Sequence, residues 1–286
     1  MKCAARLKNS ILFLLIPVLV LSGCSSGKQK AVSSETVYTA PAFADVTFDE
    51  TAAAGQDGIL IDLSHTALGY VGVSAEVEGK LKFQVLFGSS TYTYDLPSDG
   101  TPTFFCLQSG NGSYTFQVMK NTTGNKYVKL YDTKADVTLQ DEFQPFLRPS
   151  QYVNYSADSE CVKKAEELAS GASDQLDVVN AVFDYIQKNI TYDQEKADTV
   201  QSGYLSDPDE TLSTGKGICF DYAALATAML RSEGIPVKMI FGYVTGDIYH
   251  AWNMFYTDET GWVAVKYEVS GDTWQRLDLT FSAGGV

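Results

Sequence analysis

The chain has 286 residues, of which 45% are hydrophobic and 20% are charged, and its formal net charge is -14 at pH 7. This length supports one or two domains with a sizeable core. The acidic balance argues against a nucleic-acid partner, because binding to phosphates requires clustered lysine and arginine side chains.

Residues 1–23 have the features of an export signal peptide. Three basic residues come first: Lys2, Arg6 and Lys8. The apolar run Ile11–Leu21 follows, and it is too short to span a membrane comfortably. Its end, Leu21-Ser22-Gly23-Cys24, resembles the lipobox of bacterial lipoproteins, whose cysteine is lipidated and becomes the mature N-terminus. We therefore expect lipidation at Cys24 and a protein anchored in the lipid bilayer of a bacterial cell membrane, facing the extracytoplasmic side.

The next two segments differ in their patterning. Residues 24–41 are polar and rich in small residues, which is typical of a tether. Residues 42–148 contain short alternating stretches with β-branched and aromatic residues, separated by glycine-bearing turns. The clearest stretches are 81–87, 114–118 and 127–131. This pattern predicts an all-β, sandwich-like domain. Its single histidine, His65, is expected at the surface or in a turn.

From residue 149 onward the apolar spacing becomes helical. Ser156 is a candidate N-cap for a helix that places Cys161 on its apolar face and stops at Gly171. A second helix is predicted over 176–190, and 193–210 reads as a polar loop. A third helix over 218–233 is apolar or small nearly all round, so we expect it to be buried.

Strands are predicted after the buried helix. Residues 237–244, 250–256 and 261–269 read as three successive strands, and a last strand is expected around residues 276–280. Helices that feed an antiparallel sheet make residues 149–286 an α+β domain.

The chain has five cysteines. Cys3 lies in the signal segment and Cys24 is the expected lipidation site, so Cys106, Cys161 and Cys219 remain. An odd number cannot all pair, and whether Cys106 and Cys161 form a disulfide stays open. The chain has no Cys-x-x-Cys and only two histidines, so a zinc site has little support and no cofactor is expected.

Cys219 stands at the start of the buried helix. The free N–H groups of a first helical turn and a nearby histidine can both lower the pKa of a thiol. The same N–H groups could stabilise an oxyanion during acyl transfer. Gly215 and Gly217 would let the backbone turn sharply and approach a substrate closely.

A nucleophilic cysteine needs a base and a group that orients the base. His250 is the only histidine of the C-terminal half and opens a predicted strand. Asp278 lies among apolar residues on the last predicted strand, where a buried carboxylate needs a partner such as an imidazole N–H. Asp272 is nearer in sequence, but it sits in a Gly-Asp turn and ranks second.

Several short motifs occur in one order along the C-terminal half. They are Gly217-Ile218-Cys219-Phe220-Asp221-Tyr222-Ala223, Gly234-Ile235-Pro236, Gly242-Tyr243, His250-Ala251-Trp252-Asn253 and Asp278-Leu279-Thr280. Together they resemble the transglutaminase-like superfamily over about residues 176–281.

This resemblance implies a papain-like α+β fold with a catalytic triad. In that triad Cys219 would be the nucleophile, His250 the base and acid, and Asp278 the orienting group. Tyr192 falls on a recurrent tyrosine of such domains and could assist the oxyanion, although a packing aromatic after a helix explains it equally well. Leu279 departs from the family pattern, because many members carry proline there.

The leading hypothesis is a membrane-anchored extracellular thiol enzyme that cleaves or transfers acyl groups of peptide or glutamine-type amides. Its substrate would be a peptide, a protein or a cell-wall component, with hydrolysis slightly favoured over cross-linking by family analogy. The alternative is a catalytically silent surface scaffold that binds a partner through the β-domain. A redox or metal-binding role is a more remote third reading, because Cys219 has no second cysteine nearby.

Overall fold

A computed structural model describes residues 37–244, 248–270 and 273–279, and these lie within one compact unit. The side chains of Ile248, 266–270 and 273–279 are not part of this description. The predicted signal peptide, the lipidation site Cys24, most of the predicted tether and Asp272 lie outside the described residues.

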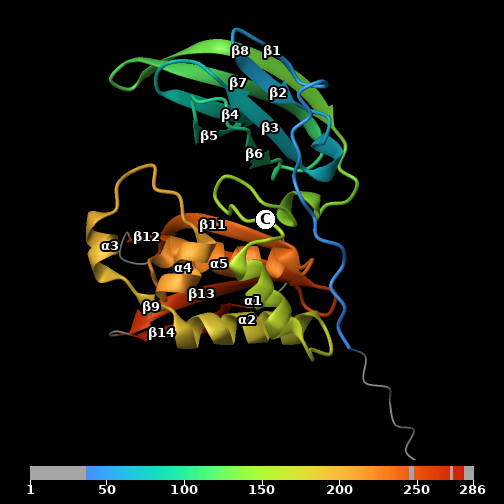
Figure 1. Cartoon of the computed structure of the whole chain (residues 1–286), viewed down its shortest axis with the longest axis vertical. Coiled ribbons are helices and arrows are strands. Elements are labelled where there is room, and N and C mark those ends of the chain that lie inside the picture. Colours follow the sequence, from blue (N-terminus) through green and yellow to red (C-terminus); the bar gives the residue numbers. More distant parts are fainter. Residues whose placement is uncertain (1–36, 245–247, 271–272, 280–286) are drawn as a thin grey trace, which may run out of the picture. The chain divides into compact units, whose positions relative to one another are not determined.

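The first part of the fold consists of two antiparallel sheets (Figure 1). One has the order β1-β2-β3-β6, built from β1 (Ala54–Gln56), β2 (Ile59–Asp62), β3 (Tyr70–Ala75) and β6 (Thr103–Cys106). The other has the order β5-β4-β7-β8, built from β5 (Ser90–Leu96), β4 (Leu81–Phe87), β7 (Gly112–Thr123) and β8 (Lys126–Val137). Two short 3-10 helices, η1 (Thr66–Leu68) and η2 (Gln144–Phe146), complete this part.

One hydrophobic core joins these two sheets. Ile61 and Val73 from the first sheet and Phe83 and Phe116 from the second are all fully buried in the same cluster. Burial alternates along β4, as expected for strands with one face on a core. The sandwich-like, all-β prediction for this region is confirmed.

The second part combines helices with one antiparallel sheet (Figure 1). Its main helices are α1 (Glu160–Ala169), α2 (Gln175–Asn189) and α5 (Cys219–Ser232). The sheet has the order β11-β12-β13-β14, built from β11 (Val237–Val244), β12 (Ile248–Thr257), β13 (Gly261–Ser270) and β14 (Thr273–Leu279). Buried side chains of the helices and the sheet share a second core, which confirms the α+β prediction.

Helix α1 begins later than predicted. Its N-cap is Ser159 rather than Ser156, and no side chain of the N-cap satisfies the first N–H groups. The carboxylate of Asp209 does so instead, because it accepts hydrogen bonds from the N–H groups of Glu160 at 3.1 Å and Cys161 at 2.8 Å. The acceptor comes from a segment 48 residues away, so local sequence could not reveal it.

The segment predicted as a polar loop over 193–210 contains two helices, and that prediction was wrong. Helix α3 (Gln194–Thr199) begins after Asp193, whose side chain accepts the N–H of Lys196. Helix α4 (Pro208–Thr214) begins after Asp207 in the same way, with proline at its first position. Aspartate N-caps and a proline at the first helical position favour a helix start even in a polar sequence.

Two short strands connect these helices to α5. Strand β9 (Thr191–Tyr192) pairs in parallel with β10 (Lys216–Gly217), so Tyr192 lies beside Gly217. No helix among the described residues is long and apolar enough to cross a membrane.

The structure describes three cysteines and His65. Cys106, Cys161 and Cys219 are all free, so Cys106 and Cys161 do not pair. Cys161 belongs to α1 and is fully buried in the second core, as predicted. His65 precedes η1 and stacks on Tyr70 with 5.1 Å between ring centroids.

The end of the predicted tether is held against the helical part. The N–H of Tyr38 donates a hydrogen bond to the carbonyl oxygen of Ala172 at 2.8 Å, and its hydroxyl donates to the carbonyl oxygen of Glu233. Pro41 lies against Gly234, where an added Cβ would meet the proline ring at 2.1 Å. Residues 38–41 therefore pack against the helical part, and the chain then continues into the first sheets.

Candidate active site

Cys219 is the first residue of α5, as the sequence predicts. Its sulfur is half-buried, and β12 passes close to it at Ala251. Burial raises the pKa of the Cys219 thiol, and the N–H groups of Ala251 and Phe220 offset this only in part. The direction is opposite to the lowered pKa expected from the helix start, because the thiol loses contact with water.

His250 immediately precedes Ala251. It lies in β12 opposite Gly242 of β11. Cys219, His250 and Ala251 line one cavity of about 610 Å³, which we call the thiol cavity. The tertiary structure thus brings the predicted nucleophile and the predicted base to the same cavity across 31 residues of sequence.

A buried amide holds β12 against α5. The Asn253 side chain is fully buried and donates hydrogen bonds to the carbonyl oxygen of Ala223 at 3.0 Å and to the hydroxyl of Thr227 at 2.8 Å. Thr227 in turn donates to the same carbonyl oxygen at 2.7 Å. Because Asn253 lies three residues after His250 in β12, this network fixes the position of β12 relative to α5, which begins with Cys219.

The predicted sharp turn before Cys219 is found at Gly215. Gly215 ends α4 in the left-handed region, with φ of 63°. Gly217 leaves room for Asp221, because an added Cβ would lie 2.6 Å from the Cβ of that residue. Both therefore shape the entry into α5, and their close approach to a substrate stays a prediction.

Asp221 organises the start of α5. Its carboxylate is fully buried and accepts hydrogen bonds from the Ile218 N–H at 2.9 Å and the Tyr204 hydroxyl at 2.6 Å. It also pairs with the Lys196 ammonium at 2.8 Å. These contacts tie α3 and the segment before α4 to the turn that carries Cys219, so they stabilise the start of α5.

Tyr192 also lines the thiol cavity. Burial raises the pKa of its hydroxyl, and the neighbouring Cys219 contributes to the same direction. A neutral phenol close to the thiol can donate a hydrogen bond. Its role in assisting an oxyanion stays a prediction.

Asp278 is described by its backbone alone. It lies in β14 opposite Val265 of β13, and Val265 lies opposite Asn253 of β12. Strand β13 therefore separates the backbone of Asp278 from the strand of His250. Its orienting role stays a prediction.

Aromatic side chains form much of the rest of the thiol cavity, and sequence reasoning missed them. Phe220 packs edge-on against Phe241 at 5.2 Å and against Tyr152 at 6.0 Å, and Phe241 stacks on Tyr249 at 6.4 Å. Lys82, Thr93 and Asp95 of the first part of the fold line the same cavity. The alternating pattern of their strands did not predict this position, because the residues line the cavity only when the two parts of the fold pack together.

A family comparison covers most of the second part of the fold. Residues 162–267 match the model of the Transglutaminase-like superfamily. This segment is a transglutaminase-like domain. It includes Cys219 and His250, whereas Asp278 lies beyond the matched range. Among the described residues no group of three or more histidine, cysteine or acidic side chains is placed to hold a metal ion.

Similar proteins were found over part of the chain. A UPF0252 protein of Methanocaldococcus jannaschii is 30% identical over 41% of this chain and 33% of its own length. The uncharacterized protein YebA of Bacillus subtilis is 30% identical over 36% of this chain and 16% of its own length. The chain thus spans a third or less of these two relatives.

Solved structures with related folds are more distant. A candidate cysteine protease from Cytophaga hutchinsonii has 20% identity and a TM-score of 0.36, with 67% of each chain covered. The periplasmic domain of TgpA from Pseudomonas aeruginosa has 15% identity and a TM-score of 0.35, over 74% of this chain and 73% of that one. Red sea bream transglutaminase has 12% identity and a TM-score of 0.30, over 68% and 47%.

Proposed function

We propose that the protein is a thiol enzyme that acts on peptide or glutamine-type amides, with Cys219 as the nucleophile and His250 as the base. The observation that carries this proposal is the thiol cavity, which Cys219 and His250 both line. A thiol and an imidazole beside one cavity can carry out acyl transfer. Asp278 is proposed to orient the imidazole.

The reaction would proceed in two steps. The sulfur of Cys219 attacks the amide carbonyl carbon and His250 takes the thiol proton; the C–N bond then breaks, and the leaving amine or ammonia departs with that proton. Water or a second amine next attacks the thioester, His250 takes its proton, and the sulfur leaves as the thiol when the proton returns to it. The N–H groups at the start of α5 are suited to stabilise the oxyanion of both tetrahedral intermediates.

The raised pKa of Cys219 affects the order of these events. Burial favours the neutral thiol in the substrate-free protein. We therefore infer that His250 removes the proton as the sulfur attacks, instead of maintaining a thiolate beforehand.

Hydrolysis is favoured over cross-linking as the outcome. This preference rests on analogy with exported bacterial members of the superfamily, so the test must include both acceptors. The full chain is incubated with a peptide library and a cell-wall extract, with and without an added primary amine. Mass spectrometry of the trapped enzyme then locates the acyl group.

A thioester on Cys219 that is absent from Cys219→Ala supports the proposal. His250→Ala should lower its formation by at least about a hundredfold, within the range for loss of a general base. His65→Ala is the matched control, because His65 stacks on Tyr70 and does not line the thiol cavity. Acylation that persists in Cys219→Ala, or that falls equally in both histidine variants, would contradict it.

We also propose that the protein is held on the extracytoplasmic face of the bacterial membrane by lipid on Cys24, where peptide, protein or cell-wall substrates are within reach. The lipobox-like stretch before Cys24 supports this anchoring. Metabolic labelling with a fatty acid should mark the wild-type chain and leave Cys24→Ala unlabelled and in the soluble fraction. Equal labelling of both would contradict the anchor.

A further inference from the structure

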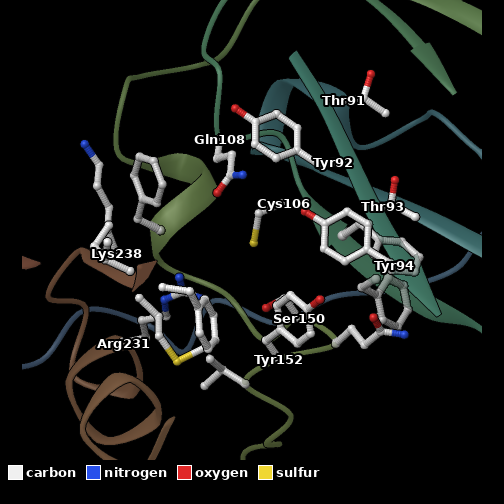
Figure 2. A pocket seen from close by; sticks show the side chains of 18 residues that line it. Thr91, Tyr92, Thr93, Tyr94, Cys106, Gln108, Ser150, Tyr152, Arg231 and Lys238 are labelled. Atoms are coloured by element: carbon white, nitrogen blue, oxygen red, sulfur yellow. The ribbon is translucent and has the colours of Figure 1, made fainter. Parts of the chain in front are cut away.

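A second cavity of about 610 Å³ adjoins the thiol cavity (Figure 2). Four residues line both of them: Thr93, Gln151, Tyr152 and Phe241. The two cavities therefore meet at these four side chains. A chain bound at Cys219 could extend past them from one cavity into the other.

The charge of the second cavity differs from that of the whole protein. Arg231 and Lys238 are its two charged lining residues, and no carboxylate lines it. The protein carries 35 acidic and 21 basic residues, so a lining with two cations and no acid runs against the composition. The Lys238 ammonium lies 3.9 Å from the ring centre of Trp262, and the charge of Glu142, which lines a neighbouring cavity together with Lys238, acts on it from outside the second cavity.

Arg231 is a buried cation without an ionic partner among the described residues. Its exposed fraction is 4%, and no described carboxylate lies within 4.0 Å of it. Its guanidinium donates to the carbonyl oxygen of Val237 from Nε at 3.1 Å and from Nη2 at 2.8 Å, and to that of Arg148 from Nη1 at 2.6 Å. These bonds use three of the five N–H donors of an arginine, so two have no protein acceptor among the described residues.

A burial cost of this kind is normally offset by an anion. A guanidinium out of contact with water is stabilised most by a carboxylate, which can accept two parallel hydrogen bonds. The carbonyl oxygens of Val237 and Arg148 supply partial charge only. The second cavity is therefore complementary to a ligand that brings the missing negative charge.

Gln151 supplies a second recognition point. It is 9% exposed, its N–H donates to the carbonyl oxygen of Phe104 at 2.9 Å, and its Nε2 donates to the carbonyl oxygen of Asp95. Its Oε1 is buried and has no hydrogen-bond partner among the described residues. A buried acceptor without a partner costs stability, and an N–H group of a ligand would satisfy it.

We propose that the second cavity binds a carboxylate-bearing segment of a peptide, with the carboxylate on Arg231 and a peptide N–H on Gln151. The identification of this segment as part of the substrate rests on the proposed function, because it assumes that the same chain is attacked at Cys219. The binding itself does not depend on catalysis. The enzyme then selects peptides with a free C-terminal carboxylate or an acidic residue near the scissile amide.

Cys106 provides a reporter inside the second cavity. Figure 2 shows its sulfur pointing into the space between Tyr94 and Arg231. It is free and half-buried, whereas Cys161 is fully buried. A ligand on Arg231 should therefore shield Cys106 from alkylation, and mass spectrometry of the digested protein can follow that one thiol.

The experiment uses the full chain with Cys219→Ala, so that no turnover occurs. Two probes are compared at up to about 10 mM, a range that includes weak, millimolar binding. They are N-acetyl-tetraalanine with a free C-terminal carboxylate and the same peptide with a C-terminal amide. The ratio of iodoacetamide labelling rates at Cys106 without and with each probe measures protection.

We expect the acid probe to slow labelling of Cys106 by at least about fivefold at saturation, and to do so at about tenfold lower concentration than the amide probe. A tenfold difference is the size expected for one hydrogen-bonded charged group. Equal protection by both probes, or protection by neither, overturns the proposal.

Two variants test the charge without removing Arg231, whose backbone contacts support the fold. Gln108→Glu places a carboxylate at an exposed lining position with almost no change in shape. Lys238→Gln removes one of the two cations. Both should shrink the advantage of the acid probe to threefold or less, and an unchanged advantage in both would count against the assignment.

The two proposals can fail separately. Protection of Cys106 by the acid probe together with no thioester on Cys219 would leave the carboxylate site in place and contradict the proposed catalysis. A thioester on Cys219 together with equal acylation of acid and amide peptides would leave the catalysis in place and overturn the carboxylate site.

Discussion

The hydroxyl of Tyr204 donates a hydrogen bond to the carboxylate of Asp221 at 2.6 Å. This bond joins the segment before α4, which forms one wall of the thiol cavity, to the first turn of the helix that begins with Cys219. The Lys196 ammonium contacts both partners, at 2.6 Å from the Tyr204 oxygen and 2.8 Å from the Asp221 carboxylate. The buried carboxylate of Asp221 thus connects this wall of the thiol cavity to the helix turn that carries Cys219.

Tyr204→Phe should weaken this connection. It removes one hydrogen bond to a buried carboxylate, and we expect a loss of about 1 to 3 kcal/mol in the free energy of unfolding. The KM for a peptide substrate should rise more than kcat falls, because the wall loosens while Cys219 stays in place. Urea denaturation and steady-state kinetics measure the two effects.

Lys196→Met is the matched comparison on the same carboxylate. It leaves Asp221 without its ion-pair partner, so we expect a larger loss of about 2 to 4 kcal/mol. A smaller loss than that of Tyr204→Phe would show that the hydroxyl, and not the ammonium, carries the stabilisation.

The amide of Asn253 and the hydroxyl of Thr227 should be energetically coupled. Thr227→Val and Asn253→Ala each break the 2.8 Å hydrogen bond between β12 and α5. In a double-mutant cycle the coupling free energy should be about 1 to 2 kcal/mol, because both groups are buried. Thioester formation should fall in either single variant as the strand of His250 shifts. Strict additivity would mean that the bond does not hold the strand.

The reactivity of Cys219 toward iodoacetamide should depend steeply on pH. Burial raises the pKa of this thiol, so the thiolate fraction at pH 7 is smaller than in an unfolded peptide. We expect slower alkylation than that of a cysteine peptide at pH 7, with a rise of about tenfold per pH unit toward pH 9. Rapid alkylation already at pH 6 would instead indicate a preformed thiolate–imidazolium pair.

Glu233 should make stability depend on pH. Burial, with a smaller contribution from Glu166, raises the pKa of its carboxyl from 4.5 to about 7. The folded state then binds more protons than the unfolded state between these values, so stability falls as pH rises through this window and levels off above it. The full effect is about 3 kcal/mol.

Glu233→Gln is the control for that titration. The neutral amide keeps the size of the side chain, so the melting temperature of this variant should change less between pH 5 and pH 8 than that of the wild type. At pH 8 the variant should have the higher melting temperature of the two proteins. An identical pH profile in both proteins would exclude Glu233 as the responsible group.

Local sequence patterns determined a large part of this protein. Alternation along residues such as Leu81 and Phe83 predicted the strands of the first sheets, because only one face of such a strand is buried. The small residues of 218–233 predicted a buried helix, and its start placed Cys219 where it is found. These features depend on residues that are only a few positions apart in the chain, so they can be read from a single sequence.

Contacts between distant segments were decided only by the tertiary structure. Asp209 caps α1 from another helix, and burial reverses the direction expected for the pKa of Cys219. Gln151 and Arg231 meet at one cavity although no local pattern links them. Capping, desolvation and cavity charge depend on which segments pack together in space, so a chain without its fold does not reveal them.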